Sequence, residues 1–204
     1  MADLVIEHLE RTRLGEAAVM LARAFDDSPI FEYLFPDDRA RARITAGFFR
    51  AVCSDALPFG DVYVAVEDRR IIGAACWYAP GRYPPSQLRQ LRQLANVLAL
   101  GRHAPSRMRM ALTYLNATEK VHPKNEHWYL AILGVEPERQ GQGIGARLID
   151  HTLDPLDHEG LDAYLETDKE SNLAWYARRR FELRETLHPA PDGPPTWTMW
   201  RAAL

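Results

Sequence analysis

The sequence contains little cysteine, with Cys53 and Cys76 as the two thiols in 204 residues. Two cysteines are too few for a disulfide framework, and their wide separation does not match the spacing of metal ligands. No metal is therefore expected, and a reducing cytoplasm is the expected location. Cys76 lies in an apolar run, where a buried packing thiol is a more common role than a nucleophile.

An excess of positive charge is also missing, since 25 Lys and Arg stand against 28 Asp and Glu. Nucleic-acid-binding proteins usually carry a basic surface, so nucleic acid is not an expected partner. No run approaches the roughly 20 apolar residues of a membrane span. The beginning Met-Ala-Asp-Leu lacks the charged and apolar regions of a signal peptide. A membrane partner is therefore not expected.

The length and the ordinary composition predict one globular α/β domain over residues 1–204. In the first part of the chain we expect strands at 4–9, 62–66 and 71–78 and helices at 14–25, after Ser28-Pro29, and at 39–52. The two later strands, joined by a short polar link, predict an antiparallel hairpin. Prolines then open residues 84–120, where helical spacing at 88–98 and 108–115 predicts a helical insert.

The second part of the chain predicts a strand, a glycine-rich loop and a helix. We expect the strand at 127–135, the helix at 143–153, a further strand at 161–166, a helix at 172–179 and a hairpin of 181–187 with 197–201. The loop Arg139-Gln-Gly-Gln-Gly-Ile-Gly145 stands directly before the helix. Unpaired N–H groups at a helix start bind anions, and glycines allow close approach, so the loop predicts a phosphate site.

A dinucleotide-binding loop is the alternative interpretation, because Gly141-x-Gly143-x-x-Ala146 fits that pattern as well. Asp162 or Glu166 would then be the acid that binds the ribose. The position in the chain argues against this alternative. A dinucleotide fold has the loop at its first strand and needs further βα units, whereas this chain ends soon afterwards in a hairpin.

The loop resembles the signature of the GCN5-related N-acetyltransferase (GNAT) superfamily, Gln/Arg-x-x-Gly-x-Gly/Ala, which occurs here as Gln140-x-x-Gly143-x-Gly145. Leu165-Glu-Thr167, Asn172-Leu-Ala-Trp-Tyr176 and Phe181 resemble its second signature. Segments 128–135, 165–167, 172–173 and 196–199 are similar to the branch that includes puromycin N-acetyltransferase. The resemblance is strong over 127–199 and weaker over 17–77.

The resemblance implies a mixed α/β fold, with a central, mostly antiparallel sheet flanked by helices. Strands 127–135 and 161–166 would splay apart and admit the pantetheine arm of acetyl-CoA. The residues that it implies for cofactor binding are Leu133, Gly134, Val135, Gln140, Gly141, Gln142, Gly143, Ile144, Gly145, Ala146 and Asn172. For Asn172, a plain helix cap is the alternative role.

The resemblance also implies direct attack of an amine on the thioester, with Tyr176 protonating the coenzyme A thiolate. Arg180 replaces the glycine that usually precedes the final Phe, which is expected to alter the turn after Tyr176. His127 is a candidate general base on the strand face of His127, Tyr129 and Ala131, with a structural role as the alternative. Asp26, Asp27 and Glu32 are candidates for binding the acceptor amine, or are caps and solvated acids.

The sequence thus favours an enzyme that acetylates a small-molecule amine, such as an antibiotic or metabolite. A non-catalytic acyl-CoA-binding module and a protein or peptide N-terminal acetyltransferase are the alternatives. The insert at 84–120 is expected to cover the acceptor site or to form a homodimer contact.

Overall fold

The computed structural model of the chain describes residues 4–86, 89 and 105–204. Seven strands form one sheet in the order β1-β2-β3-β4-β5-β7-β6. The strands are β1 (Val5–His8), β2 (Val62–Glu67), β3 (Arg70–Tyr78), β4 (Trp128–Val135), β5 (Ala163–Thr167), β6 (Glu182–Leu187) and β7 (Thr196–Arg201). All neighbours pair antiparallel except β4 and β5, which are parallel. The expected mixed, mostly antiparallel sheet is therefore confirmed.

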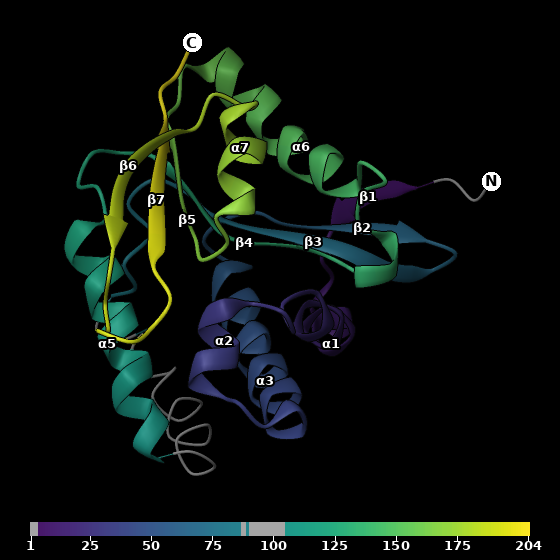
Figure 1. The fold of residues 1–204 in the computed structure, drawn as a ribbon. Coiled ribbons are helices and arrows are strands. Elements are labelled where there is room, and N and C mark those ends of the chain that lie inside the picture. The colour runs from purple at the N-terminus through teal and green to yellow at the C-terminus, as the bar shows by residue number, and fades with distance from the viewer. Residues whose placement is uncertain (1–3, 87–88, 90–104) are drawn as a thin grey trace.

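The helices cover both faces of this sheet. They are α1 (Leu14–Ala24), α2 (Pro29–Leu34), α3 (Asp38–Ala56), α5 (Pro105–Val121), α6 (Ile144–Glu159) and α7 (Ser171–Ala177), with short 3-10 turns at Arg11–Arg13 and Pro137–Arg139. Figure 1 shows α1, α2 and α3 on one side of the sheet and α6 and α7 on the other. Each side has its own core of buried apolar residues.

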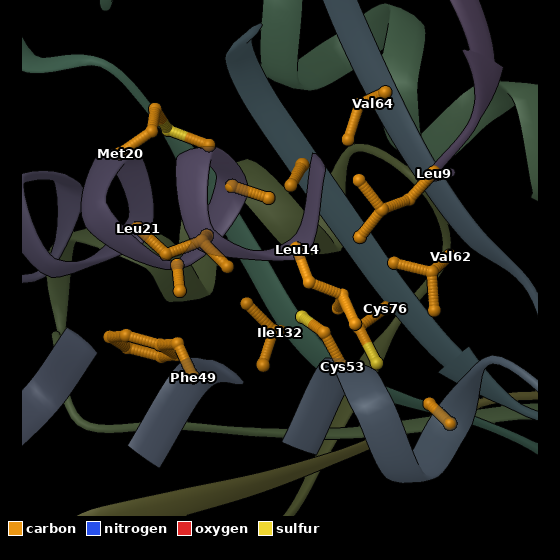
Figure 2. Close-up of a cluster of buried hydrophobic side chains, with 14 of the residues drawn as sticks. Leu9, Leu14, Met20, Leu21, Phe49, Cys53, Val62, Val64, Cys76 and Ile132 are labelled. Atoms are coloured by element: carbon orange, nitrogen blue, oxygen red, sulfur yellow. The ribbon is translucent and has the colours of Figure 1, made fainter. Parts of the chain in front are cut away.

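The core on the side of α1 and α3 contains both cysteines (Figure 2). Cys53 comes from α3 and Cys76 from β3, and both are free and buried. A hydrogen bond with Cys53, together with burial, raises the pKa of Cys76 well above its ordinary value. Because the thiolate is the nucleophilic form, Cys76 is a packing residue.

The N-terminus of α2 forms as the sequence predicts. The backbone of Ser28 is extended, its hydroxyl accepts a hydrogen bond from the N–H of Phe31, and Pro29 is the first helical residue. This cap ends the α1–α2 loop and fixes its position. That loop matters for the site because it carries two of the acids predicted to bind the acceptor.

Two helices are longer than the sequence predicts. Helix α3 continues to Ala56, and α6 passes through Pro155 and ends only at Glu159. In both cases a buried residue, Ala56 or Leu156, holds the last turn against the core, and this packing outweighs the local signal to stop.

The helical insert is described in part. The helix expected at 88–98 lies outside the described residues, apart from Arg89, whereas the one expected at 108–115 is present as α5. Helix α5 joins two distant segments: the Tyr114 hydroxyl donates to the carbonyl of Pro194 (3.0 Å), and Arg107 donates to the carbonyl of Tyr33 (3.3 Å). It therefore links α2 to the β6–β7 loop. Among the described helices, none is long and apolar enough to cross a membrane.

Candidate active site

The glycine loop joins β4 to α6 and exposes backbone amides. Gly141 and Gly143 have positive φ angles of 74° and 80°, which residues with side chains rarely adopt. A Cβ added at either position would meet no atom within 4 Å, so the space beside the loop is open. The first intrahelical bond of α6 runs from the N–H of Arg147 to the carbonyl of Gly143. The N–H groups of residues 144–146 precede it and are available to an anion.

Ion pairs hold this loop in place from two sides. Arg139 contacts Glu67 at the end of β2 with both terminal nitrogens, and its Nε donates to Gln142 (3.0 Å). Glu136 accepts two hydrogen bonds from Arg23 of α1, at 2.7 and 2.6 Å. Glu136 and Arg139 thus tie the start of the loop, before its glycines, to α1 and β2.

Strands β4 and β5 pair over only three residues each, from Trp128 with Ala163 to Leu130 with Leu165. Beyond Leu130 the edge of β4 is no longer paired with β5. Ala131 has no partner in the register with β3, so a β-bulge lies where the strands part. The expected splay of the two strands is therefore present.

The backbone of β4 presents alternate residues to this free edge. The N–H of Glu136 bonds to Ile72 of β3, so Leu133 and Val135 turn their amides to the opposite edge. The side chain of Gln140 donates to the carbonyl of Val135 (3.1 Å). Gly134 has a packing role, since an added Cβ would lie 2.8 Å from Leu21 of α1. Cofactor binding by these residues stays a prediction.

Tyr176 lies on α7, in the core shared with α6. Burial raises the pKa of its hydroxyl well above the ordinary value, so the phenol keeps its proton at neutral pH. The hydroxyl forms no hydrogen bond with the residues that the structure describes. It is thus a protonated donor without a protein acceptor, which suits the role of a general acid.

Asn172 does not cap α7, because the N-cap residue is Glu170. Its side-chain amide instead donates to the hydroxyl of Thr167 at the end of β5 (3.1 Å). The helix-cap alternative for Asn172 is therefore wrong, and the side chain links α7 to the end of β5.

Arg180 keeps the backbone conformation that a glycine would have. Its φ angle is 65°, in the left-handed region, and its side chain forms an ion pair with Asp157 of α6 (2.5 Å). Arg180 therefore occupies a left-handed position that glycine adopts without strain, and an altered turn after Tyr176 stays a prediction. The N–H of Phe181 closes the turn on the carbonyl of Tyr176 (3.3 Å).

The acids of the α1–α2 loop are engaged by basic residues. Asp26 accepts a hydrogen bond from Arg41 of α3 (3.2 Å), and Asp27 forms an ion pair with Lys169 (2.5 Å). Glu32 is exposed on the first turn of α2. The structure thus explains Asp26 and Asp27 by contacts within the chain, and binding of the acceptor by these acids stays a prediction.

Asp168 is a site residue that the sequence analysis missed. It accepts hydrogen bonds from the hydroxyl of Ser28 and from the N–H of Ile30 (3.1 Å). Together with the pair of Lys169 and Asp27, it ties the β5–α7 loop to the α1–α2 loop. No sequence pattern joins segments so far apart, so the tertiary contact was needed to find it.

A buried group of polar and aromatic side chains lies along the paired part of β4 and β5, with Glu166 one residue beyond the last pair. We call it the His–Glu cluster, and it consists of Tyr83, His122, His127, Tyr129, Tyr164 and Glu166. The Tyr129 hydroxyl donates to Oε2 of Glu166 (2.5 Å). Burial, followed by the Glu166 carboxylate, raises the pKa of Tyr129 well above its usual value.

His127 belongs to this cluster, and both of its ring nitrogens are engaged. Nδ1 lies 2.6 Å from the carbonyl of Asn125, and Nε2 lies 3.2 Å from Nε2 of His122. Burial lowers the pKa of His127, which keeps the ring neutral. Both ring nitrogens are thus engaged by other residues of the chain, and the role of His127 as a general base stays a prediction.

Glu166 was considered in the sequence only as a ribose-binding acid of the dinucleotide alternative. Its place in Leu165-Glu-Thr167, two residues after Tyr164, was the available signal, since alternate residues of a strand share a face. Its partner His122 follows α5, and no spacing rule predicts that contact.

The phenol of Tyr176 and the His–Glu cluster lie on opposite faces of the sheet. Tyr176 belongs to the core with α6, and Tyr129 and Tyr164 of the His–Glu cluster belong to the core with α1 and α3. Within the described ranges, no group of three or more His, Cys, Asp or Glu could hold a metal.

The chain is similar to several acetyltransferases. An uncharacterised N-acetyltransferase of Schizosaccharomyces pombe is 24% identical over 197 residues, which span 93% of this chain and 78% of the relative. A solved histone acetyltransferase-related protein of Corynebacterium glutamicum has a TM-score of 0.74 at 20% identity, over 100% of this chain and 98% of that one. A Drosophila melanogaster polyamine N-acetyltransferase has a TM-score of 0.62 at 15% identity, over 98% and 100%.

A further solved structure, a GNAT family acetyltransferase from Brucella melitensis, contains acetyl-CoA. Its TM-score is 0.52 at 16% identity, and the match covers 99% of this chain and 89% of that one. At such identities the solved structures show a shared fold. The model of the acetyltransferase (GNAT) family matches residues 20–181, which include the glycine loop, the separated strands and Tyr176. This chain therefore belongs to the GNAT family of acetyltransferases and is an N-acetyltransferase.

Proposed function

We propose that the protein transfers the acetyl group of acetyl-CoA to a primary amine of a small molecule, by direct attack of the amine on the thioester. The observation that carries this proposal is the pairing of an open glycine loop at the start of α6 with the loss of β4–β5 pairing directly beside it. A ligand with a pyrophosphate and a long thin arm matches these two features.

The proposed cofactor contacts follow from the backbone. The amides of residues 141–146 would hold the pyrophosphate, because they lie at a helix start and glycines leave the approach open. The free edge of β4 at Leu133 and Val135 would bind the amide groups of the pantetheine arm, as an added strand would. Tyr176 would donate its phenol proton to the departing sulfur.

A cationic amine is the acceptor class that the site supports. The His–Glu cluster places a mostly buried carboxylate, Glu166, among aromatic rings at the strand separation, without an Arg or Lys partner in the described part of the chain. Carboxylates and tyrosine faces both attract ammonium groups. Solved relatives of the same fold are named for polyamines, agmatine and arylalkylamines, which are all amines.

The test is to incubate the protein with acetyl-CoA and a panel of amines while the release of free thiol is followed. The panel would contain polyamines, agmatine, arylalkylamines, amino antibiotics and peptides with free N-termini. Thiol release and a product heavier by one acetyl group on a small amine would support the proposal. Turnover on the peptides alone would make the protein a peptide acetyltransferase, and acetyl-CoA binding without turnover on any amine would contradict the enzyme.

The proposal also includes the number of domains, the location in the cell and the oligomeric state. We expect a single domain located in the cytoplasm, consistent with two buried and unpaired cysteines. A homodimer stays a prediction, which measurement of the molar mass in solution would test.

A further inference from the structure

The hydrogen bonds of the His–Glu cluster determine which ring nitrogens carry protons. A carbonyl oxygen can only accept, so Nδ1 of His127 is the protonated nitrogen in its contact with Asn125. Nε2 of the neutral His127 ring then carries a lone pair. His122 must therefore donate from its own Nε2 across 3.2 Å. When the ring of His122 is neutral, its Nδ1 then carries a lone pair and no hydrogen.

Nδ1 of His122 faces a carboxylate oxygen of Glu166. Nδ1 of His122 lies 3.8 Å from Oε1 of Glu166, and both atoms are buried without a hydrogen-bond partner. The side chain of His122 is 4% exposed and that of Glu166 is 12% exposed. With a neutral His122 and an ionised Glu166, two lone pairs face each other in this buried site. A proton placed between them would turn this unfavourable contact into a charge-assisted hydrogen bond.

We propose that Glu166 is the catalytic base of this enzyme, that it accepts a proton from the acceptor ammonium, and that His122 then shares this proton. The inference rests on the proposed acetyl transfer. The side chain of Glu166 is more exposed than that of His122, although its Oε1 is itself buried, and Glu166 lies one residue beyond the last β4–β5 pair, where the thioester would be held. Tyr129 orients its carboxylate, and His127 keeps the bare nitrogen of His122 directed at it.

Each turnover moves two protons from the acceptor nitrogen and one from Tyr176. The ammonium R–NH₃⁺ transfers one proton to Glu166 and becomes R–NH₂, and the proton then lies between Oε1 of Glu166 and Nδ1 of His122. The free amine attacks the thioester carbonyl, the C–N bond forms and the C–S bond breaks. The sulfur takes the phenol proton of Tyr176, which regains the second proton lost by the nitrogen. The pair of Glu166 and His122 releases its proton to water when the product leaves.

The reaction therefore selects acceptors that arrive as ammonium ions. The buried carboxylate attracts the cation and gains a hydrogen-bond donor from it. Other titratable or charged groups around the pair are Tyr83, Tyr129, Tyr164 and His127 in direct contact and Glu119, Asp162 and Arg184 further away.

The first experiment compares Glu166→Gln with the unchanged protein, using an amine that the protein acetylates. Gln keeps the shape and can still accept the hydrogen bond of Tyr129, but it cannot take a proton. We expect kcat near neutral pH to fall by at least about 100-fold, while the Kd of acetyl-CoA and the melting temperature stay unchanged. Glu185→Gln on the exposed strand β6 is the matched control. A kcat of Glu166→Gln within about threefold of the control would overturn the proposal.

The pH profile separates a base from a structural residue. Solution deprotonates the acceptor by itself as the pH approaches the amine pKa of about 10. The deficit of Glu166→Gln should therefore shrink as the pH rises. A deficit that is the same at every pH would contradict the role of Glu166 as a base.

The second experiment does not need turnover. Long-range ¹H–¹⁵N NMR spectra of the free protein near neutral pH report which ring nitrogen of each histidine is protonated. We expect hydrogen on Nδ1 of His127 and on Nε2 of His122. In His127→Phe, which keeps an aromatic ring, the fraction of His122 with hydrogen on Nε2 should fall. A proton on Nδ1 of His122 in the free protein would overturn the inference, whether or not the wild-type protein acetylates any amine.

Discussion

Gly143 and Gly160 occupy the two ends of helix α6 in the same left-handed conformation, with φ angles of 80° and 66°. Neither would place a Cβ within 4 Å of another atom. A side chain introduced at either position would therefore strain the backbone in the same way and would find open space. They differ in that Gly143 belongs to the loop with free amides, whereas Gly160 ends the helix on the far side.

Gly143→Val is expected to weaken coenzyme A binding by at least about tenfold. The branched side chain would project into the space that the pyrophosphate is proposed to occupy. Both Gly143→Val and Gly160→Val should lose about 1–2 kcal/mol of stability, because each forces a β-branched residue into a positive φ. Calorimetric titration with coenzyme A would measure the binding. Equal dissociation constants for the two variants would contradict the proposed phosphate site.

Tyr176→Phe is expected to lower kcat by about 100-fold or more, with little change in acetyl-CoA affinity. Burial raises the pKa of this hydroxyl, so its proton is available throughout the neutral range, and Phe removes that proton but keeps the ring. Tyr63→Phe on β2 is the control, since Tyr63 packs against His8 and His151 away from the separated strands. A turnover of Tyr176→Phe equal to that of the control would remove the assigned role.

Arg180→Gly and Arg180→Ala separate backbone strain from charge. Both changes lose the ion pair with Asp157, but only glycine adopts a φ of 65° without a steric penalty. We expect Arg180→Gly to be more stable than Arg180→Ala by about 1 kcal/mol. Urea unfolding of both variants would measure this difference. If alanine were equally stable, the left-handed conformation of the turn would be in doubt.

Asp157 is expected to make the free energy of unfolding decrease at acidic pH. Burial opposes its charge, but hydrogen bonds from Arg201 and Arg180 outweigh that effect and lower its pKa below the ordinary 3.8. A lowered folded pKa gives stability that is fully present above the unfolded value and is lost as the pH falls through the folded value. Asp157→Asn should therefore be less stable than the unchanged protein at neutral pH, by about 1 kcal/mol after allowance for solvent screening.

Unfolding curves at several pH values would check this expectation. The stability difference between the two proteins should stay constant above about pH 5 and close below about pH 4. A difference that persists unchanged into strong acid would show that the loss comes from packing and not from the charge of Asp157.

Much of the fold could be predicted from local pattern. The β2–β3 hairpin with its short polar link, the Ser28-Pro29 start of α2 and the glycines before α6 each form within a few residues, so the chain alone specifies them. The predicted end of α6, near Leu153, was wrong. Pro155 is a local signal for a helix to stop, but burial of Leu156 in the packed core keeps the helix going to Glu159.

By itself the sequence determined the glycine loop before α6, the strands that flank it along the chain and the short helix with Tyr176, because these depend on residues close together in the chain. Only the tertiary structure decided which groups meet in the His–Glu cluster. His122 follows α5 and Glu166 lies on β5, and their approach depends on how an insert packs against a sheet. The same packing engages both nitrogens of His127, the residue that the sequence suggested as the base. Side-chain protonation depends on such contacts, and sequence spacing does not encode them.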